Sequence, residues 1–92
     1  DLTAAAVLEW ARKRGHRVPE DFKVVGFDAT AAMRRALPGL TTIQQPIDAL
    51  ALCAVDVLLG QIDARAEGVE PHEAESHSPA PLPIRLLTGI TT

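Results

Sequence analysis

The sequence predicts an α/β fold, in the order helix, strand, short helix, short strand, long helix and closing strand. Two stretches with helical periodicity, 2–14 and 47–66, are separated by the run 22–27, which is typical of a strand. Hydrophobic residues make up 47% of the 92 residues but aromatic residues only 3%, which favours helices packed on a sheet over an aromatic-rich barrel. We therefore expect helices layered on a largely parallel sheet.

The first helix is expected over residues 2–14. Asp1 is placed to cap it, because an Asp side chain can accept a hydrogen bond from an N–H of the first turn. Gly15 is placed to end it in the left-handed conformation. The apolar residues of this helix fall on one stripe: Ala4, Val7, Leu8 and Ala11.

A strand is expected from Phe22 to Phe27, and it delivers one acid, Asp28, to its carboxyl end. The run shows little polar alternation, which predicts cover on both faces, as in a parallel sheet. Residues 29–37 are weakly helical and end at a proline-glycine turn. Residues 40–43 then form a short strand or an extended crossover.

The second helix, 47–66, is apolar nearly all round, so we expect neighbours on more than one side of it. Its longest stripe comprises Ile47, Leu50, Ala51, Ala54, Leu58 and Ile62. A polar loop, 68–81, and a closing strand, 83–88, follow. If the helix lacks its partners, either a dimer that covers its apolar surface or a compact rearrangement is expected.

Composition limits the function classes. A formal charge of −3 makes the chain a poor candidate for binding nucleic acid unaided. One cysteine, Cys53, allows no internal disulfide, and no apolar run approaches the length of a membrane span. The start on Asp-Leu-Thr, without a methionine, suggests a piece of a longer protein.

No catalytic or metal constellation is apparent, so we expect neither an enzyme nor a cofactor. The cluster His72, Glu73, Glu75 and His77 does not have the helical spacing of a zinc site and lies in a predicted loop. We interpret it as a solvated loop. Cys53 lies in an apolar helix and is interpreted as a small buried hydrophobe.

Two ordered groups of motifs resemble the effector-binding domain of the LacI/GalR family of bacterial transcriptional repressors. The first is Gly15-x-Arg17-Val18-Pro19-x-Asp21 followed by Val24-Val25-Gly26-Phe27-Asp28. The second is Pro38-x-Leu40-Thr41-Thr42-Ile43-x-Gln45-Pro46, followed by an apolar helix and a Leu-Pro-x-x-Leu strand. The match runs over essentially the whole chain, but Ala29 replaces an acid or Asn, and Ala51 replaces a Gly, that the family often has.

The resemblance implies part of a periplasmic-binding-protein-like (type I) fold, with two α/β lobes joined by crossovers around a small ligand. Residues 1–45 would belong to the C-terminal lobe, 46–66 to a helix of the other lobe, and 67–92 to a loop and the closing strand. The operator-binding helix-turn-helix of the family is absent from this chain.

Two residues are candidate ligand contacts. In open α/β sheets ligands lie beyond the carboxyl ends of the strands, and in the family the acid that matches Asp28 commonly touches the effector. Asp28 could instead cap the segment that follows it. Ile47 could line the cleft as an apolar wall, or pack in the core of the first helical turn.

The resemblance also implies a dimer interface, formed by the first helix and the segment after Asp28. It carries onto Ala5, Leu8, Met33 and Ala36. Packing within the chain is the alternative, and it is an equal alternative for Leu8. The Met33 side chain is expected to be exposed, which favours the interface.

The function implied is a regulatory binding module of a cytoplasmic, homodimeric repressor. A small effector, expected to be a sugar, would change operator affinity through the angle between the lobes. The alternative is part of a transport-type periplasmic sugar-binding protein with the same fold. No residue set supports a small α/β enzyme.

Overall fold

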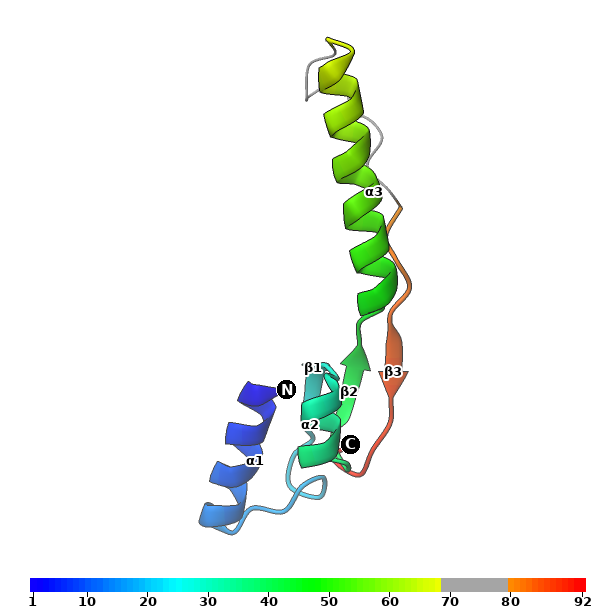
Figure 1. The fold of residues 1–92 in the computed structure, drawn as a ribbon. Helices are drawn as coiled ribbons and strands as arrows, with labels where there is room; N and C mark the ends of the chain where they lie inside the picture. Colours follow the sequence, from blue (N-terminus) through cyan, green and yellow to red (C-terminus); the bar gives the residue numbers. More distant parts are fainter. Residues whose placement is uncertain (69–79) are drawn as a thin grey trace. The chain divides into compact units, whose positions relative to one another are not determined.

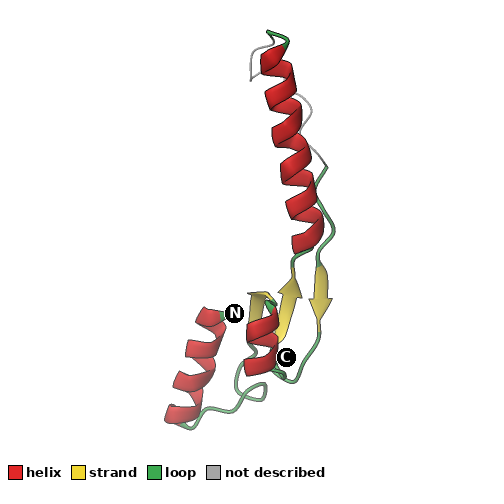
Figure 2. Cartoon of the chain, viewed as in Figure 1, coloured by secondary structure: helices red, strands yellow, loops and turns green. Residues whose placement is uncertain are grey.

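The computed structural model describes residues 1–68 and 80–92, and it has helices and strands in the predicted order (Figures 1 and 2). The elements are α1 (Leu2–Arg14), β1 (Val25–Asp28), α2 (Ala31–Ala36), β2 (Thr41–Gln44), α3 (Ile47–Ala66) and β3 (Arg85–Leu87). The chain divides into two compact units. The first comprises Asp1–Gln45 and Ile84–Thr92, and the second comprises Pro46–Pro83.

The first unit is built on a three-stranded sheet in the order β1-β2-β3 (Figure 2). Strands β1 and β2 are parallel, with Val25 opposite Thr41 and Asp28 opposite Gln44. The closing strand β3 pairs antiparallel with β2. The predicted parallel pair is therefore present, and the stretch proposed as a crossover is the central strand of the sheet.

Strand β1 begins three residues later than predicted, at Val25. Val24 and Phe22 precede the strand and pack in the core instead. The expected cover on both faces is also wrong for the described chain. Val25 and Phe27 share one face of the strand and are 52% and 46% exposed, whereas Gly26 on the opposite face is buried.

The core of the first unit is small and is formed by α1 and by the residues that immediately precede β1 and β2. Ala4, Val24 and Leu40 are buried together. Four half-buried residues pack against them: Leu8, Val18, Phe22 and Leu37. Because the buried members are mostly short, polar contacts matter more here than in a larger core.

Threonine side chains join the end of the chain to the sheet. The buried Thr91 hydroxyl accepts a hydrogen bond from Thr41 N–H at 2.9 Å and donates one to Val24 C=O at 2.7 Å. Val24 N–H in turn donates to Thr91 C=O at 2.9 Å. The turn before it requires a glycine at position 89, because a Cβ there would lie 2.7 Å from the carbonyl carbon of Gly39.

Helix α1 has the predicted bounds and ends at Gly15, whose φ of 73° is left-handed. The predicted cap at Asp1 is wrong, because the Asp1 side chain makes no cap hydrogen bond to the helix. Its carboxylate instead accepts hydrogen bonds from Thr42 Oγ1 at 2.6 Å and from Ala29 N–H at 2.7 Å. Hydrogen bonds from the Asp1 carboxylate to Thr42 and Ala29 therefore take the place of the predicted cap.

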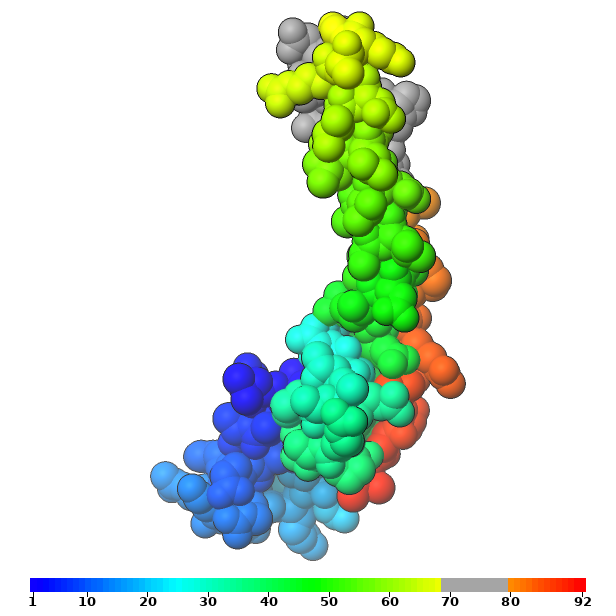
Figure 3. Space-filling model, in the orientation of Figure 1, coloured from blue at the N-terminus to red at the C-terminus, as the bar shows by residue number. Residues whose placement is uncertain are grey.

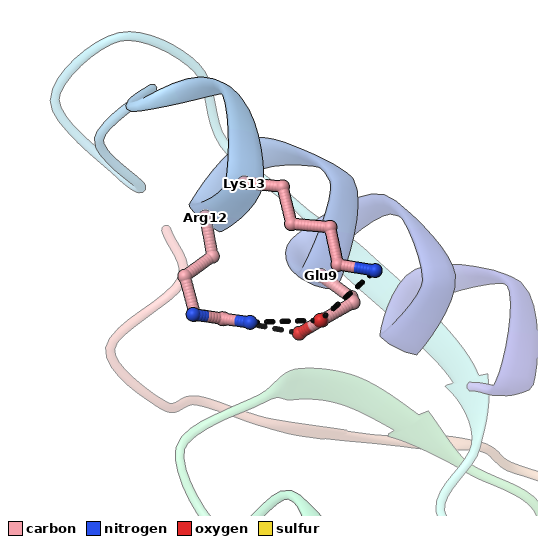
Figure 4. A network of polar contacts seen from close by, with 3 residues as sticks. All are labelled: Glu9, Arg12 and Lys13. Atoms are coloured by element: carbon pink, nitrogen blue, oxygen red, sulfur yellow. Dashed lines mark hydrogen bonds and ion pairs between the residues drawn. The ribbon is translucent and has the colours of Figure 1, made fainter.

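An ion-pair network covers the outer side of α1 (Figure 4). Arg12 donates two hydrogen bonds to the Glu9 carboxylate, at 2.9 and 3.1 Å, and Lys13 Nζ lies 3.5 Å from it. The hydrogen bonds from Arg12 are the main cause that lowers the pKa of Glu9 to about 2. All three side chains are exposed, so salt screens the network.

The second unit contains α3, which spans the predicted 20 residues. No residue of α3 is buried, and its large apolar side chains are exposed. They include Leu50, Leu52, Val55, Leu58, Leu59 and Ile62. Within the described residues these apolar side chains are left uncovered, and the expected dimer or rearrangement that would cover them stays a prediction. None of the described helices combines the length and apolar character needed to cross a membrane.

Candidate functional site

Asp28 is the last residue of β1 and lies at the carboxyl end of the parallel strand pair, opposite Gln44. Its φ of 111° and the φ of 52° at Ala29 are both positive, which is uncommon for residues other than glycine. The chain therefore turns away sharply just after the strand. Such backbone strain occurs often at functional sites.

A glutamine from the neighbouring strand end orients the Asp28 carboxylate. Gln45 follows β2 directly, and its side-chain N–H donates a hydrogen bond to Asp28 Oδ1. The predicted alternative role of Asp28, capping the next segment, is wrong. The cap of α2 is Thr30, whose hydroxyl accepts a hydrogen bond from Met33 N–H at 3.3 Å.

The Asp28–Gln45 pair combines acceptors and donors at one exposed point. After the bond between them, Asp28 keeps one oxygen free to accept, and Gln45 keeps a second N–H and a carbonyl oxygen. A ligand with neighbouring hydroxyl groups can donate to the first residue and accept from the second. The pair is therefore suited to the recognition of hydroxyl groups.

The other candidate ligand residue, Ile47, lies in the first turn of α3 and belongs to the second compact unit. It is 57% exposed. The alternative of core packing in that turn is therefore wrong. An exposed isoleucine beside the exit of a strand stays available as an apolar wall for a ligand.

The four candidate interface residues differ in exposure. Leu8 packs against the core of the first unit, which favours the intrachain alternative for that residue. Ala5 and Met33 are half-buried, and Ala36 is exposed. Met33 is thus less exposed than expected, because its side chain lines a cavity beside α2.

That cavity was not predicted from the sequence. It lies in the first unit, has a volume of about 670 Å³ and is lined by residues of α2, β2 and β3. The surfaces of α2 and of the segment following β3 adjoin on the face shown in Figure 3. Asp28 is not among its lining residues. The adjacent cations Arg34 and Arg35 were the only sequence signal for it.

The sequence cluster His72, Glu73, Glu75 and His77 lies outside the described residues. Within residues 1–68 and 80–92, no group of three or more His, Cys, Asp or Glu side chains comes together as metal ligands would.

Comparison with known proteins places these observations in a family. Residues 1–88 match the model of the periplasmic binding protein-like domain. The repressor PurR of Escherichia fergusonii is 40% identical over 77 residues, which are 84% of this chain and 22% of that protein. The sucrose operon repressor of Pediococcus pentosaceus is 35% identical over 91 residues, or 99% of this chain and 26% of the repressor.

A solved structure agrees with the sequence relatives. The crystal structure of a LacI family transcriptional regulator from Arthrobacter sp. FB24, in complex with lactose, matches the whole chain with a TM-score of 0.70 and 30% identity. The chain covers 32% of that protein.

The fold and these matches define an α/β domain of the periplasmic binding protein-like type. The chain belongs to the periplasmic binding protein-like domain family, and within it to the effector-binding domain of LacI-type transcriptional regulators. It spans about a fifth to a quarter of the length of the curated relatives that it matches. The relatives carry the names of repressors and not of enzymes.

Proposed function

We propose that this chain is the C-terminal part of a sugar-sensing domain that couples effector binding to operator affinity in a LacI-type regulator. Residues 1–45 and the closing strand belong to the C-terminal lobe, and helix 46–66 belongs to the other lobe. The single observation that carries the proposal is the placement of Asp28, at the carboxyl end of a parallel strand pair and oriented by Gln45.

A sugar is the favoured effector for two reasons. The Asp28–Gln45 pair offers acceptors and donors suited to neighbouring hydroxyl groups. Relatives are named as sucrose and ribose operon repressors, and the similar solved structure is a complex with lactose. Asp28 would bind hydroxyl groups, and Ile47 would form an apolar wall against a sugar ring.

The coupling would run through the central strand. Strand β2 is bonded to both of its neighbours, and its exit leads through Gln45 to α3, at the boundary between the two compact units. The two candidate ligand residues, Asp28 and Ile47, belong one to each unit. A ligand that binds one lobe arrangement of the parent domain more tightly than another shifts the equilibrium between them.

The functional unit is proposed to be a homodimer in the cytoplasm, where a repressor meets its operator. Ala5, Met33 and Ala36 would contribute to the dimer interface, and Leu8 would support it from the core. Operator DNA would be bound by a segment outside this chain, as the resemblance to LacI-type repressors implies. We expect no catalytic step.

The proposal is tested by measuring operator binding by the complete natural protein, with sugars as the variable. A panel of mono- and disaccharides is titrated in a fluorescence-anisotropy assay. The labelled DNA is taken from the region upstream of the gene that encodes the protein. At least one sugar is expected to change DNA affinity about fivefold or more. If sugars bind yet leave DNA affinity unchanged, a transport-type sugar-binding protein is the better assignment.

A further inference from the structure

The cavity of the first unit is distinguished by its charge. Three arginines line it: Arg34 and Arg35 from α2, and Arg85 from β3. Arg35 and Arg85 lie 50 positions apart in the sequence, and the fold brings them to one cavity. The one acid in the lining is Asp1.

The positive charges are not compensated by described residues, whereas the negative one is. None of the three arginines forms an ion pair with a residue in 1–68 or 80–92. Asp1, in contrast, accepts hydrogen bonds from Thr42 and from Ala29 N–H through both carboxylate oxygens. The cavity is therefore lined by three arginines without an ion pair among the described residues and by one acid whose carboxylate oxygens already accept hydrogen bonds.

Local structural roles account for the arginines singly but not together. Arg34 and Arg35 lie in the last turn of α2, where cations suit the helix dipole. Arg85 lies on an edge strand, where a charge opposes unwanted strand pairing. Neither role requires that the side chains converge on one cavity from two different elements.

The size and the remaining lining suit a small molecule. A volume of about 670 Å³ falls within the range of small-molecule sites, roughly 300–1,000 Å³. Met33, Leu37 and Leu87 supply apolar walls beside the charges. The planar fork of arginine matches phosphate oxygens in pairs, which distinguishes it from lysine at such sites.

We propose that this cavity binds a small phosphate-bearing metabolite, at a site separate from the Asp28–Gln45 pair. Because the arginines are exposed, binding depends on ionic strength and weakens as salt is added. The site goes beyond the proposed sugar-sensing function, and it holds or fails independently of that function. A regulator built this way has a second input, the supply of phosphorylated metabolites.

The test is isothermal titration of the complete natural protein with pyrophosphate as the probe, at low and at moderate salt. Saturable binding is expected, and the double variant Arg35→Gln/Arg85→Gln should weaken it at least tenfold, as loss of charge-assisted hydrogen bonds implies. Arg14→Gln and Arg65→Gln remove exposed arginines outside the cavity and should change the dissociation constant less than twofold.

Arg85→Lys separates geometry from charge. It keeps the positive charge but loses the paired hydrogen bonds, and should give an intermediate affinity. Trp10 fluorescence during thermal unfolding checks that each variant is folded. Equal weakening by the control variants, or absence of saturable heat, would overturn the proposal. The proposal would also be overturned if the arginine variants changed the oligomeric state while the wild type did not bind pyrophosphate. In that case the arginines would pair with acidic side chains of a second copy of the chain.

Discussion

The hydroxyl of Thr42 donates a 2.6 Å hydrogen bond to the carboxylate of Asp1, which joins the start of α1 to the central strand of the sheet. Gly26 lies directly beside this bond. A Cβ at position 26 would come within 3.2 Å of Thr42 Oγ1 and 3.0 Å of Leu40 Cδ2, and closer still to Asp1 Oδ1. The absence of a side chain at Gly26 is thus what lets Asp1 and Thr42 meet.

Gly26→Ala should therefore destabilise the chain by about 1–3 kcal/mol, because the methyl group must displace either the hydrogen bond or Leu40. Urea unfolding followed by Trp10 fluorescence measures this, since Trp10 is the only tryptophan. Gly60→Ala is the control. Among the described residues, no atom apart from the adjacent helix backbone lies within 4 Å of a Cβ there, and the change in a helix interior should stabilise by about 0.5–1 kcal/mol. Equal effects of the two changes would contradict this account of the Asp1–Thr42 contact.

Thr91→Val tests the contact of the chain end with the sheet. The change keeps the shape of the side chain but leaves Thr41 N–H and Val24 C=O without the Thr91 hydroxyl. Because this site is buried, we expect a loss of about 1–3 kcal/mol in unfolding free energy. Thr3→Val, on the exposed side of α1, should stay within about 0.5 kcal/mol. A neutral Thr91→Val variant would show that solvent replaces these bonds.

The Glu9 network predicts a pH dependence. The folded-state pKa of Glu9, about 2, is lower than its ordinary value of 4.5, so the pair with Arg12 stabilises the chain above about pH 4.5. That stabilisation is lost as pH falls from about 4.5 towards 2, where the carboxylate takes up a proton. The thermal midpoint of the wild type should exceed that of Glu9→Gln near neutral pH and converge with it at the acid end.

Added salt is the control for this effect. The side chains are exposed, so the difference between wild type and Glu9→Gln should be small and should shrink at about 0.5 M salt. A difference that persists unchanged at pH 2 would show that the negative charge of the Glu9 carboxylate is not responsible for it.

The proposed dimer predicts a position-dependent effect of charge on α2. Ala36→Glu places an acid in the proposed interface and should shift the complete protein towards monomer in sedimentation velocity. Ala31→Glu adds the same charge at an exposed position on another face of the same helix and should leave the dimer intact. If both variants remain dimeric, this end of α2 is not in the interface.

Local patterns predicted much of the fold, for reasons visible in single residues. The periodicity of 47–66 predicted the bounds of α3, and Gly15 predicted the end of α1. Both signals are local in the sequence. The role of Asp1 could not be predicted from neighbouring residues. Its partners Ala29 and Thr42 are 28 and 41 positions away, and nothing in the first turn reveals them.

The site could be predicted in position but not in composition. The apolar run followed by one acid identified Asp28 as a strand-end carboxylate, and the resemblance supplied its role. Its partner Gln45 and the cavity arginines depend on which strand ends and helices become neighbours, which no single stretch encodes. The start of β1 was predicted too early. Phe22 and Val24 are apolar because they pack in the core, and they precede the strand.

The central claim is that Asp28 binds the effector, and Asp28→Asn in the complete protein tests it most directly. Asparagine keeps the size of the side chain and an oxygen that can accept from Gln45, but removes the negative charge. Titration calorimetry with the sugar that acts in the operator assay should show a dissociation constant raised about tenfold or more. Asp63→Asn, in the last turns of α3, should leave it unchanged. A sugar affinity equal to that of the wild type in Asp28→Asn would contradict the account.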